Sequence, residues 1–296
     1  VWEAHTYNIE YNKNSDTATG EMTRHENVAY DAEIKLTANA FKLTGYTFAG
    51  WALSADGEKV YEDEALVKEL TSVDNETVVL YAVWSENSYS IKYNSNYKMI
   101  YEDMAEATAV DGGTFKYESQ NVTIKTIAQT GFELTGYKFV GWTRDAEDLA
   151  NLIQPNEIKN KLSAEVNGIV NLYAVWEAIT YYVAFDANTG DGATMATMTV
   201  KYDEKVALTD NSYTKTGYDF GGWAETADGE KVYGDKAEIE NLTAEDGKTI
   251  TLFATWTPHV YTITYLANNG TFNKDAFASL TNVTFEKDEN DNITAV

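Results

Sequence analysis

The acidic segment after residue 185 is the first candidate for chemistry in this sequence. Asp186, Asn188 and Asp191 alternate with small residues, which is typical of a calcium-binding loop because calcium prefers carboxylate and amide oxygens. Such a loop ends on a Glu that binds the ion through both carboxylate oxygens, and here Thr197 stands at that position. The mismatch favours a turn after a strand, so we expect no metal site and no cofactor.

The other reactive side chains do not form a catalytic group. The chain has three His and no Cys, so thiol nucleophiles and thiolate metal sites are excluded. His5 and His259 hold equivalent positions in a pattern that Asn87 and Ile179 fill at its other occurrences. Carboxylate pairs recur at no fixed spacing, whereas a polysaccharide hydrolase needs two carboxylates in one deep cleft. We therefore predict no catalytic residues and no enzymatic activity.

Aromatic side chains are the second candidate for binding chemistry. The chain has 21 Tyr, 11 Phe and 7 Trp, and such rings either stack on sugars or pack in a core. Most of them alternate with polar residues in a strand-like pattern, which favours packing. Rings predicted to face solvent instead fall between residues 94 and 135, where we expect any ligand surface to lie: Tyr97, Tyr101, Phe115 and Tyr117.

Three copies of one heptapeptide position most of the rings. They are GYTFAGW at 45–51, GYKFVGW at 136–142 and GYDFGGW at 217–223, and each precedes a second motif, LYAVW or LFATW. Alternate residues of a strand share one face, so Tyr and Phe of the heptapeptide are predicted to face the core. The predicted core residues are Tyr46, Phe48, Trp51, Trp84, Tyr137, Phe139, Trp142, Trp176, Tyr218, Phe220, Trp223 and Trp256.

The spacing of these motifs predicts a tandem array of domains. The last Trp of one copy precedes the first Tyr of the next alternating strand by five positions at 2 to 7, 84 to 89, 176 to 181 and 256 to 261. We predict the last strand of a preceding repeat at 1–4, repeats at 5–86, 87–178 and 179–258, and an incomplete fourth repeat at 259–296. The second repeat is longer, with an insertion within 94–135. Each repeat is long enough to have a core of its own.

The order of an alternating strand, GYxFxGW and LYAVW resembles the Listeria–Bacteroides repeat, the B-repeat type of internalin-like bacterial surface proteins. The resemblance covers essentially the whole chain. It implies small β-grasp, ubiquitin-like domains in an extracellular stalk or adhesin of the bacterial cell surface. The residues themselves predict an α+β, β-rich fold in which each repeat is a mixed sheet with one short helix, because Leu66 and Leu70, like Ile158 and Leu162, are spaced four apart.

Charge and hydropathy limit the partners. The formal net charge of −25 repels nucleic acid and anionic lipid headgroups. No uncharged apolar stretch is long enough to cross a membrane, so we expect no membrane insertion in this segment, with the anchor and signal peptide outside it.

Two functions remain. The leading hypothesis is a stalk or spacer that presents a binding domain, because the four residues at each junction span at most about 13 to 14 Å and restrict neighbouring repeats. The alternative is an adhesive module that binds a host or bacterial surface protein or a glycan, with the repeats adding avidity. In both hypotheses the neighbouring repeats of the same chain are partners.

Overall fold

A computed structural model describes residues 4–260, 263–265, 285–287 and 293–295. The predicted strand at 1–4 and the incomplete fourth repeat at 259–296 therefore lie almost wholly outside the described residues. The chain separates into two compact units, Val1–Glu177 and Ala178–Val296. The first unit holds two of the predicted repeats and the second unit begins with the third.

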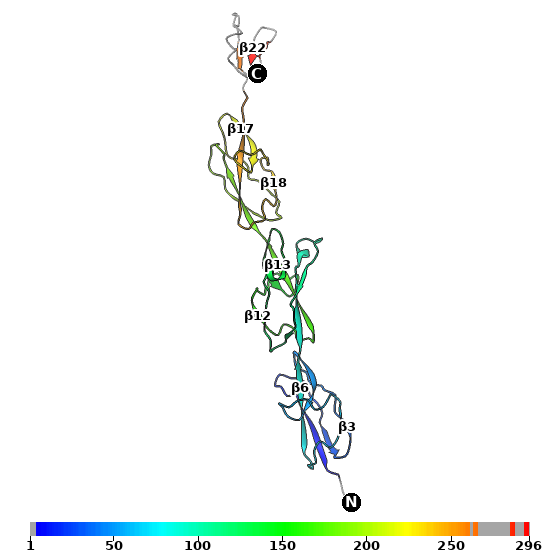
Figure 1. Cartoon of the computed structure of the whole chain (residues 1–296). Helices are drawn as coiled ribbons and strands as arrows, with labels where there is room; N and C mark the ends of the chain where they lie inside the picture. Colours follow the sequence, from blue (N-terminus) through cyan, green and yellow to red (C-terminus); the bar gives the residue numbers. More distant parts are fainter. Residues whose placement is uncertain (1–3, 261–262, 266–284, 288–292, 296) are drawn as a thin grey trace. The chain divides into compact units, whose positions relative to one another are not determined.

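Repeat 1 is built on a four-stranded mixed sheet. Its strands are β1 (Thr6–Asn12), β2 (His25–Ala29), β4 (Tyr46–Ala52) and β6 (Thr77–Glu86), in the order β2-β1-β6-β4. The central strands β1 and β6 are parallel, and the two outer strands run antiparallel to their neighbours. A separate two-stranded ladder joins β3 (Ile34–Lys35) to β5 (Leu66–Val67). Figure 1 labels β3 and β6.

Repeat 2 has the same central strands and carries the insertion. Strands β11 (Tyr137–Thr143), β13 (Gly168–Ala178), β7 (Ser88–Asn94) and β8 (Thr108–Val110) follow one another in the sheet, and β9 (Phe115–Lys116) also pairs with β7. The ladder joins β10 (Val122–Thr123) to β12 (Ile158–Lys159). The insertion contributes β8 and a 3₁₀ turn, η1 (Tyr97–Met99).

Repeat 3 returns to the plan of repeat 1. Its sheet has the order β15 (Met198–Lys201), β14 (Thr180–Asp186), β19 (Thr249–Pro258) and β17 (Tyr218–Ala224), and its ladder joins β16 (Val206–Ala207) to β18 (Glu238–Ile239). Beyond it, β20 (Ile263–Tyr265), β21 (Phe285–Lys287) and β22 (Ile293–Ala295) pair antiparallel in the order β20-β22-β21.

The prediction of a helix between the two motifs of each repeat is wrong. Leu66 and Ile158 lie in the short strands β5 and β12, and both side chains are exposed. Glu69 and Lys161 adopt positive φ angles of 54° and 53°, a left-handed conformation that a right-handed helix cannot include. Within the described part of the chain the α-helix is instead α1 (Ile127–Thr130), which a capping box between Thr126 and Gln129 begins.

Candidate functional site

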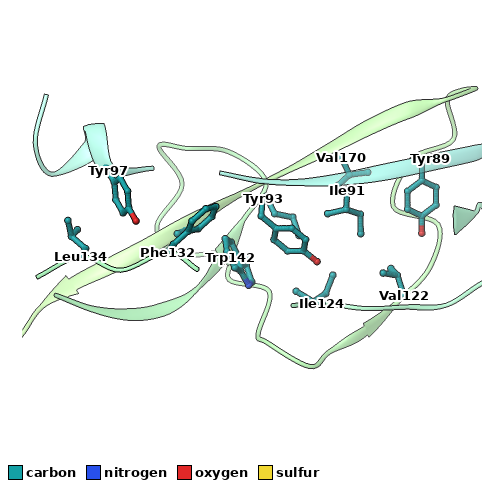
Figure 2. Close-up of a cluster of buried hydrophobic side chains, with 12 residues drawn as sticks. Tyr89, Ile91, Tyr93, Tyr97, Val122, Ile124, Phe132, Leu134, Trp142 and Val170 are labelled. Carbon is teal, nitrogen blue, oxygen red and sulfur yellow. The ribbon is translucent and has the colours of Figure 1, made fainter. Parts of the chain in front are cut away.

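The Trp of the heptapeptide lies at the centre of a separate core in each repeat. Trp51, Trp142 and Trp223 have no exposed surface. In repeat 2 the rings of Tyr93 and Phe139 both lie 4.9 Å from the Trp142 ring, and Figure 2 shows Trp142 among Tyr93, Phe132 and Ile124. Ala82 lies opposite Trp51 and Ala254 lies opposite Trp223 on the neighbouring strand, and these small residues leave room for the indole rings.

The Trp that ends each repeat lies at the edge of its core. These partly buried rings pack against the Phe of the heptapeptide at 5.8 to 5.9 Å. Their Nε1 atoms donate to the backbone oxygens of residues in the loop after the first strand: Trp84 to Lys13 (2.9 Å), Trp176 to Ser95 (2.7 Å) and Trp256 to Ala187 (3.0 Å). Sequence reasoning did not identify these hydrogen bonds, which hold that loop against the sheet.

The Tyr of the heptapeptide does not pack on the core in repeats 1 and 3, although alternation predicted it there, whereas Tyr137 packs against the core of repeat 2. Tyr218 is 38% exposed, and the partly buried Tyr46 has its ring 6.4 Å from the Tyr117 ring of the next repeat. Tyr137 is partly buried as well, and its ring is 6.0 Å from that of Tyr101. Each of these Tyr residues begins its strand, and Tyr46 and Tyr218 lie outside the clusters of core side chains.

The four rings expected on a ligand surface are not arranged as an exposed platform. Tyr97 is only 7% exposed and its hydroxyl accepts the backbone N–H of Glu133 at 3.0 Å. Tyr101 and Phe115 are partly buried and pack against the repeat 2 core. Tyr117 lies at the junction with repeat 1. The insertion folds back on the sheet through η1 and β8, which buries rings that would be exposed in an extended loop.

A polar cluster particular to repeat 2 fastens the insertion to the core. Tyr93 donates its hydroxyl to Asp111 at 3.3 Å, and the Lys125 ammonium lies 3.1 Å from the same carboxylate. Lys125 also donates to the Val110 oxygen at 3.0 Å. The Asp111 and Lys125 side chains are only 11% and 24% exposed, so the pair is held in a largely desolvated place where separating its members is costly.

The place of this cluster is filled differently in the other repeats. Repeat 1 has Tyr11 with His25, whose Nε2 is 3.1 Å from the Tyr11 hydroxyl, and repeat 3 has Phe185 at the corresponding strand position. A catalytic group would need the same chemistry in each copy to explain the repetition. The variation favours a structural role for the cluster.

Tyr93 gives a prediction on pH. Burial, the largest influence, raises the pKa of Tyr93. The backbone hydrogen bond from Lys125 lowers it and the nearby Asp111 raises it, and the net effect is a pKa of about 12. The folded pKa exceeds the unfolded value near 10, so the stabilisation is complete below pH 10 and is lost as pH rises from 10 to 12. Its size is on the order of 2–3 kcal/mol.

The measurement is the urea concentration at which half of repeat 2 is unfolded, monitored through the NMR signals of that repeat at several pH values between 9 and 12. We expect the midpoint to fall less steeply above pH 10 in Tyr93→Phe than in the unaltered chain, because phenylalanine has no proton to lose. Equal slopes in the two proteins would show that Tyr93 is not the group responsible.

The junction between repeats 1 and 2 is a direct contact of both repeats. Asn87, the third junction residue, donates its backbone N–H to the Gly45 oxygen at 2.9 Å. Its side-chain oxygen accepts the Thr47 hydroxyl at 2.6 Å, and its side-chain nitrogen donates to the Ala164 oxygen at 2.7 Å. Asn87 is 8% exposed. One buried amide thus joins the heptapeptide of repeat 1 to a loop of repeat 2.

Tyr117 and Glu118 complete this junction from the side of repeat 2. The Tyr117 ring lies against Gly45, where a Cβ atom would overlap it. Tyr46 donates its hydroxyl to Glu118 at 3.1 Å, and burial followed by this hydrogen bond raises the pKa of Tyr46. Glu118 also pairs with Lys161 at 2.6 Å. This pairing, followed by the Tyr46 hydroxyl, lowers the pKa of Glu118.

Glu86, the last residue of β6, holds the segment of repeat 2 that contains Glu118 and Ser119. Its carboxylate accepts the Ser119 backbone N–H and the Ser119 hydroxyl, both at 2.6 Å. Desolvation opposes ionisation of Glu86, but these hydrogen bonds outweigh it and lower its pKa. The sequence signal for the junction is a Tyr followed by an acid after the second strand, which recurs as Tyr30-Asp31, Tyr117-Glu118 and Tyr202-Asp203; reasoning from sequence did not recognise it.

The acidic segment after residue 185 forms a turn. Asp186 accepts the Asn188 backbone N–H at 2.7 Å, and the Asn188 side chain donates to the Ala254 oxygen at 2.9 Å. The first contact is that of an Asx turn, and the second holds this turn against β19. Across the described residues, no group of three or more His, Cys, Asp or Glu side chains is placed to hold a metal ion. None of the helices described is long and apolar enough to cross a membrane.

Comparison with known families matches three segments of the chain. The model of the Listeria-Bacteroides repeat domain matches residues 7–83, 89–175 and 181–255. These segments contain the three sheets and the three cores described above.

Similarity to individual proteins is lower. Two proteins of Evansella cellulosilytica whose names describe them as membrane proteins, the first as Gly-rich, are 26% identical over 279 residues and 25% identical over 261 residues. The matches cover 91% and 86% of this chain but only 26% and 33% of those proteins, so the chain spans about a quarter to a third of their length. Among solved structures, the Bacillus anthracis TIE protein matches 86% of this chain and 51% of its own at 11% identity, with a TM-score of 0.28.

Proposed function

Because this chain belongs to the Listeria–Bacteroides repeat family, we propose that it is a non-enzymatic repeat region of a bacterial cell-surface protein, acting as a stalk or spacer that presents a binding domain. The observation that carries the proposal is the junction of repeats 1 and 2. Side chains of Thr47, Asn87 and Glu118 hydrogen-bond across it, which restricts the orientation of one repeat on the other. A spacer needs this property and an enzyme does not.

The proposal includes an extracellular location at the cell surface. The membrane-protein names of the two relatives support it. The absence of cysteine suits an oxidising exterior. In this proposal the binding domain and the anchor belong to other parts of the protein.

The proposal also includes descent from the β-grasp fold. Two parallel central strands flanked by antiparallel strands, as in β2-β1-β6-β4, are the sheet arrangement that the resemblance implies. The segment that would cross the sheet as a helix is replaced by loops and the β3–β5 ladder.

The test is replacement of residues 5–258 within the surface protein that carries them. An unrelated, inert spacer of the same contour length should preserve attachment of the cells to their ligand, and deletion of the segment should reduce it. In parallel, the isolated chain is screened by biolayer interferometry against surface proteins and glycans of the host. Loss of attachment with the inert spacer, together with binding by the isolated chain, would overturn the proposal in favour of a directly adhesive module.

A further inference from the structure

Repeat 2 binds repeat 1 through a surface that we call the repeat-2 socket, formed by Asn87, Tyr117 and Glu118. It receives the Gly-Tyr turn of repeat 1, which is Gly45, Tyr46 and Thr47. Three contacts define the pairing: Tyr117 against Gly45, the Tyr46 hydroxyl on Glu118, and the Thr47 hydroxyl on Asn87. Repeat 1 carries the corresponding surface, the repeat-1 socket, at His5, Tyr30 and Asp31.

The backbone holds both sockets in the same way. The Tyr30 N–H donates to the His5 oxygen at 2.8 Å, as the Tyr117 N–H donates to the Asn87 oxygen at 2.9 Å. The carbonyl oxygen of the socket tyrosine then accepts an N–H from a residue with positive φ: Glu69 at 3.2 Å in repeat 1 and Lys161 at 2.7 Å in repeat 2. The two tyrosines therefore leave their strands at equivalent points.

His5 presents the same acceptor as Asn87. Its Nδ1 lies 3.0 Å from the Ser72 oxygen, where Asn87 places its amide nitrogen 2.7 Å from the Ala164 oxygen. A carbonyl oxygen only accepts hydrogen bonds, so Nδ1 carries a proton, and in the tautomer protonated at Nδ1 alone Nε2 offers a lone pair. That lone pair corresponds to the Asn87 oxygen, which accepts the Thr47 hydroxyl.

The repeat-1 socket is exposed and hollow. Tyr30 is 36% exposed, whereas Tyr117 is partly buried in the occupied socket. A hollow of about 330 Å³ is lined by Ala4, His5, Tyr30, Asp31 and Ser72. Asp31 supplies the carboxylate that Glu118 supplies in repeat 2.

The charges of the repeat-1 socket select among Gly-Tyr turns. Where repeat 2 has Lys161 beside its acid, repeat 1 has Glu69. With a lone pair on His5 and a carboxylate on Asp31, the surface favours a turn that offers hydrogen-bond donors. Gly-Tyr-Thr at 45–47 meets this requirement. The Gly-Tyr-Asp turn at 217–219 places its Asp219 carboxylate 3.0 Å from Nε2 of His259, the histidine at the position equivalent to His5. A carboxylate only accepts hydrogen bonds, so that contact needs a proton on Nε2, whereas the Thr47 hydroxyl can donate to a lone pair there.

We propose that the repeat-1 socket is a docking surface for the Gly-Tyr-Thr turn of another Listeria–Bacteroides repeat. The turn packs its Gly on Tyr30, donates the Tyr hydroxyl to Asp31 and donates the Thr hydroxyl to His5. The docking concerns how repeats join, and it holds for a spacer and for an adhesive array alike, so it stands independently of the proposed function.

The experiment adds a repeat to the full chain. A second copy of residues 5–82 is placed directly before residue 1, so that Val1 and Trp2 stand where Val83 and Trp84 follow in the original repeat. The five positions from Trp2 to Tyr7 then equal those from Trp84 to Tyr89. Hydroxyl-radical footprinting with mass spectrometry measures the oxidation rates of Tyr30 and, as an internal reference, of Tyr117.

In the extended chain, the Tyr30 oxidation rate should fall from its value in the unextended chain to about that of Tyr117. Two substitutions in the added copy alone should restore it: Tyr46→Ala, which removes the hydroxyl and the ring, and Thr47→Val, which removes the hydroxyl and keeps the shape of the side chain. Thr47→Ser keeps the hydroxyl and should keep the protection. Both altered side chains lie outside the core, and hydrogen exchange of the added copy checks its fold.

Two results would overturn the proposal. One is a Tyr30 rate that is the same with and without the added repeat. The other is protection of Tyr30 that survives both Tyr46→Ala and Thr47→Val, since protection of that kind would come from crowding by the added repeat rather than from its Gly-Tyr turn.

Discussion

Replacing Trp142 by alanine is expected to unfold repeat 2 while the cores of repeats 1 and 3 remain folded. Trp142 has no exposed surface and contacts Tyr93, Phe132 and Phe139. Truncating a buried Trp costs about 3–5 kcal/mol, a large part of the stability of a small domain. Each repeat has a separate cluster of buried residues, so the loss should stay within one repeat.

The measurement is the amide NMR spectrum of the full chain. The signals of repeat 2 should move to the narrow range of chemical shifts that is typical of unfolded chains. The socket that receives Gly45 belongs to repeat 2, so signals at the start of β4 should shift as well. Loss of signals from all three cores would contradict the independence of the cores. Unchanged signals in repeat 2 would contradict the packing role of Trp142.

A matched pair of substitutions separates packing from hydrogen bonding. The Trp142 Nε1 donates to the Lys125 oxygen at 2.8 Å, whereas the buried Nε1 of Trp51 has no partner among the described residues. Trp142→Phe should therefore destabilise its repeat by about 1 kcal/mol more than Trp51→Phe does, which is the usual net value of one hydrogen bond. Urea unfolding of the two variants gives the comparison.

Replacing Gly50 by alanine is expected to give the second largest loss. Gly50 has φ of +138° and lies at the register shift between β4 and β6. A Cβ atom there would meet the Tyr61 backbone oxygen at 2.5 Å. Backbone strain of this kind costs about 1–3 kcal/mol, and the overlap with a backbone atom adds to it. Gly222 meets the Tyr233 oxygen at the same distance, so Gly222→Ala should behave alike in repeat 3.

Gly141 is the matched control for this prediction. It occupies the same position of the heptapeptide with φ of +156°, but its neighbours are the Gln154 and Leu152 side chains at 3.1 and 3.2 Å. Side chains move aside more easily than a backbone carbonyl in a strand. Thermal unfolding should show a smaller loss for Gly141→Ala than for Gly50→Ala, and equal losses would show that the overlap with Tyr61 is unimportant.

The local sequence determined the parts of this protein that depend on alternation and repetition. Tyr7 and Ile9 alternate with polar residues and are buried, and the heptapeptide Trp recurs at the centre of each core. A strand of period two places these residues on one face wherever the strand lies. The motifs also sufficed to identify the Listeria–Bacteroides repeat, whose family model matches three tandem segments of the chain.

Tertiary structure decided what the same patterns left ambiguous. The four-residue spacing of Leu66 and Leu70 fits a helix, but the ladder with β3 and the left-handed Glu69 produce an extended segment there. Tyr46 and Phe48 share a strand face, yet only Phe48 packs on the core, whereas Tyr46, the first residue of β4, has its ring against Tyr117 of repeat 2. Tyr97 and Tyr117 were equivalent as loop rings, but one is buried by the fold of the insertion and the other contacts repeat 1. Alternation predicts the direction of a side chain, whereas only the packed domains determine which atoms it meets.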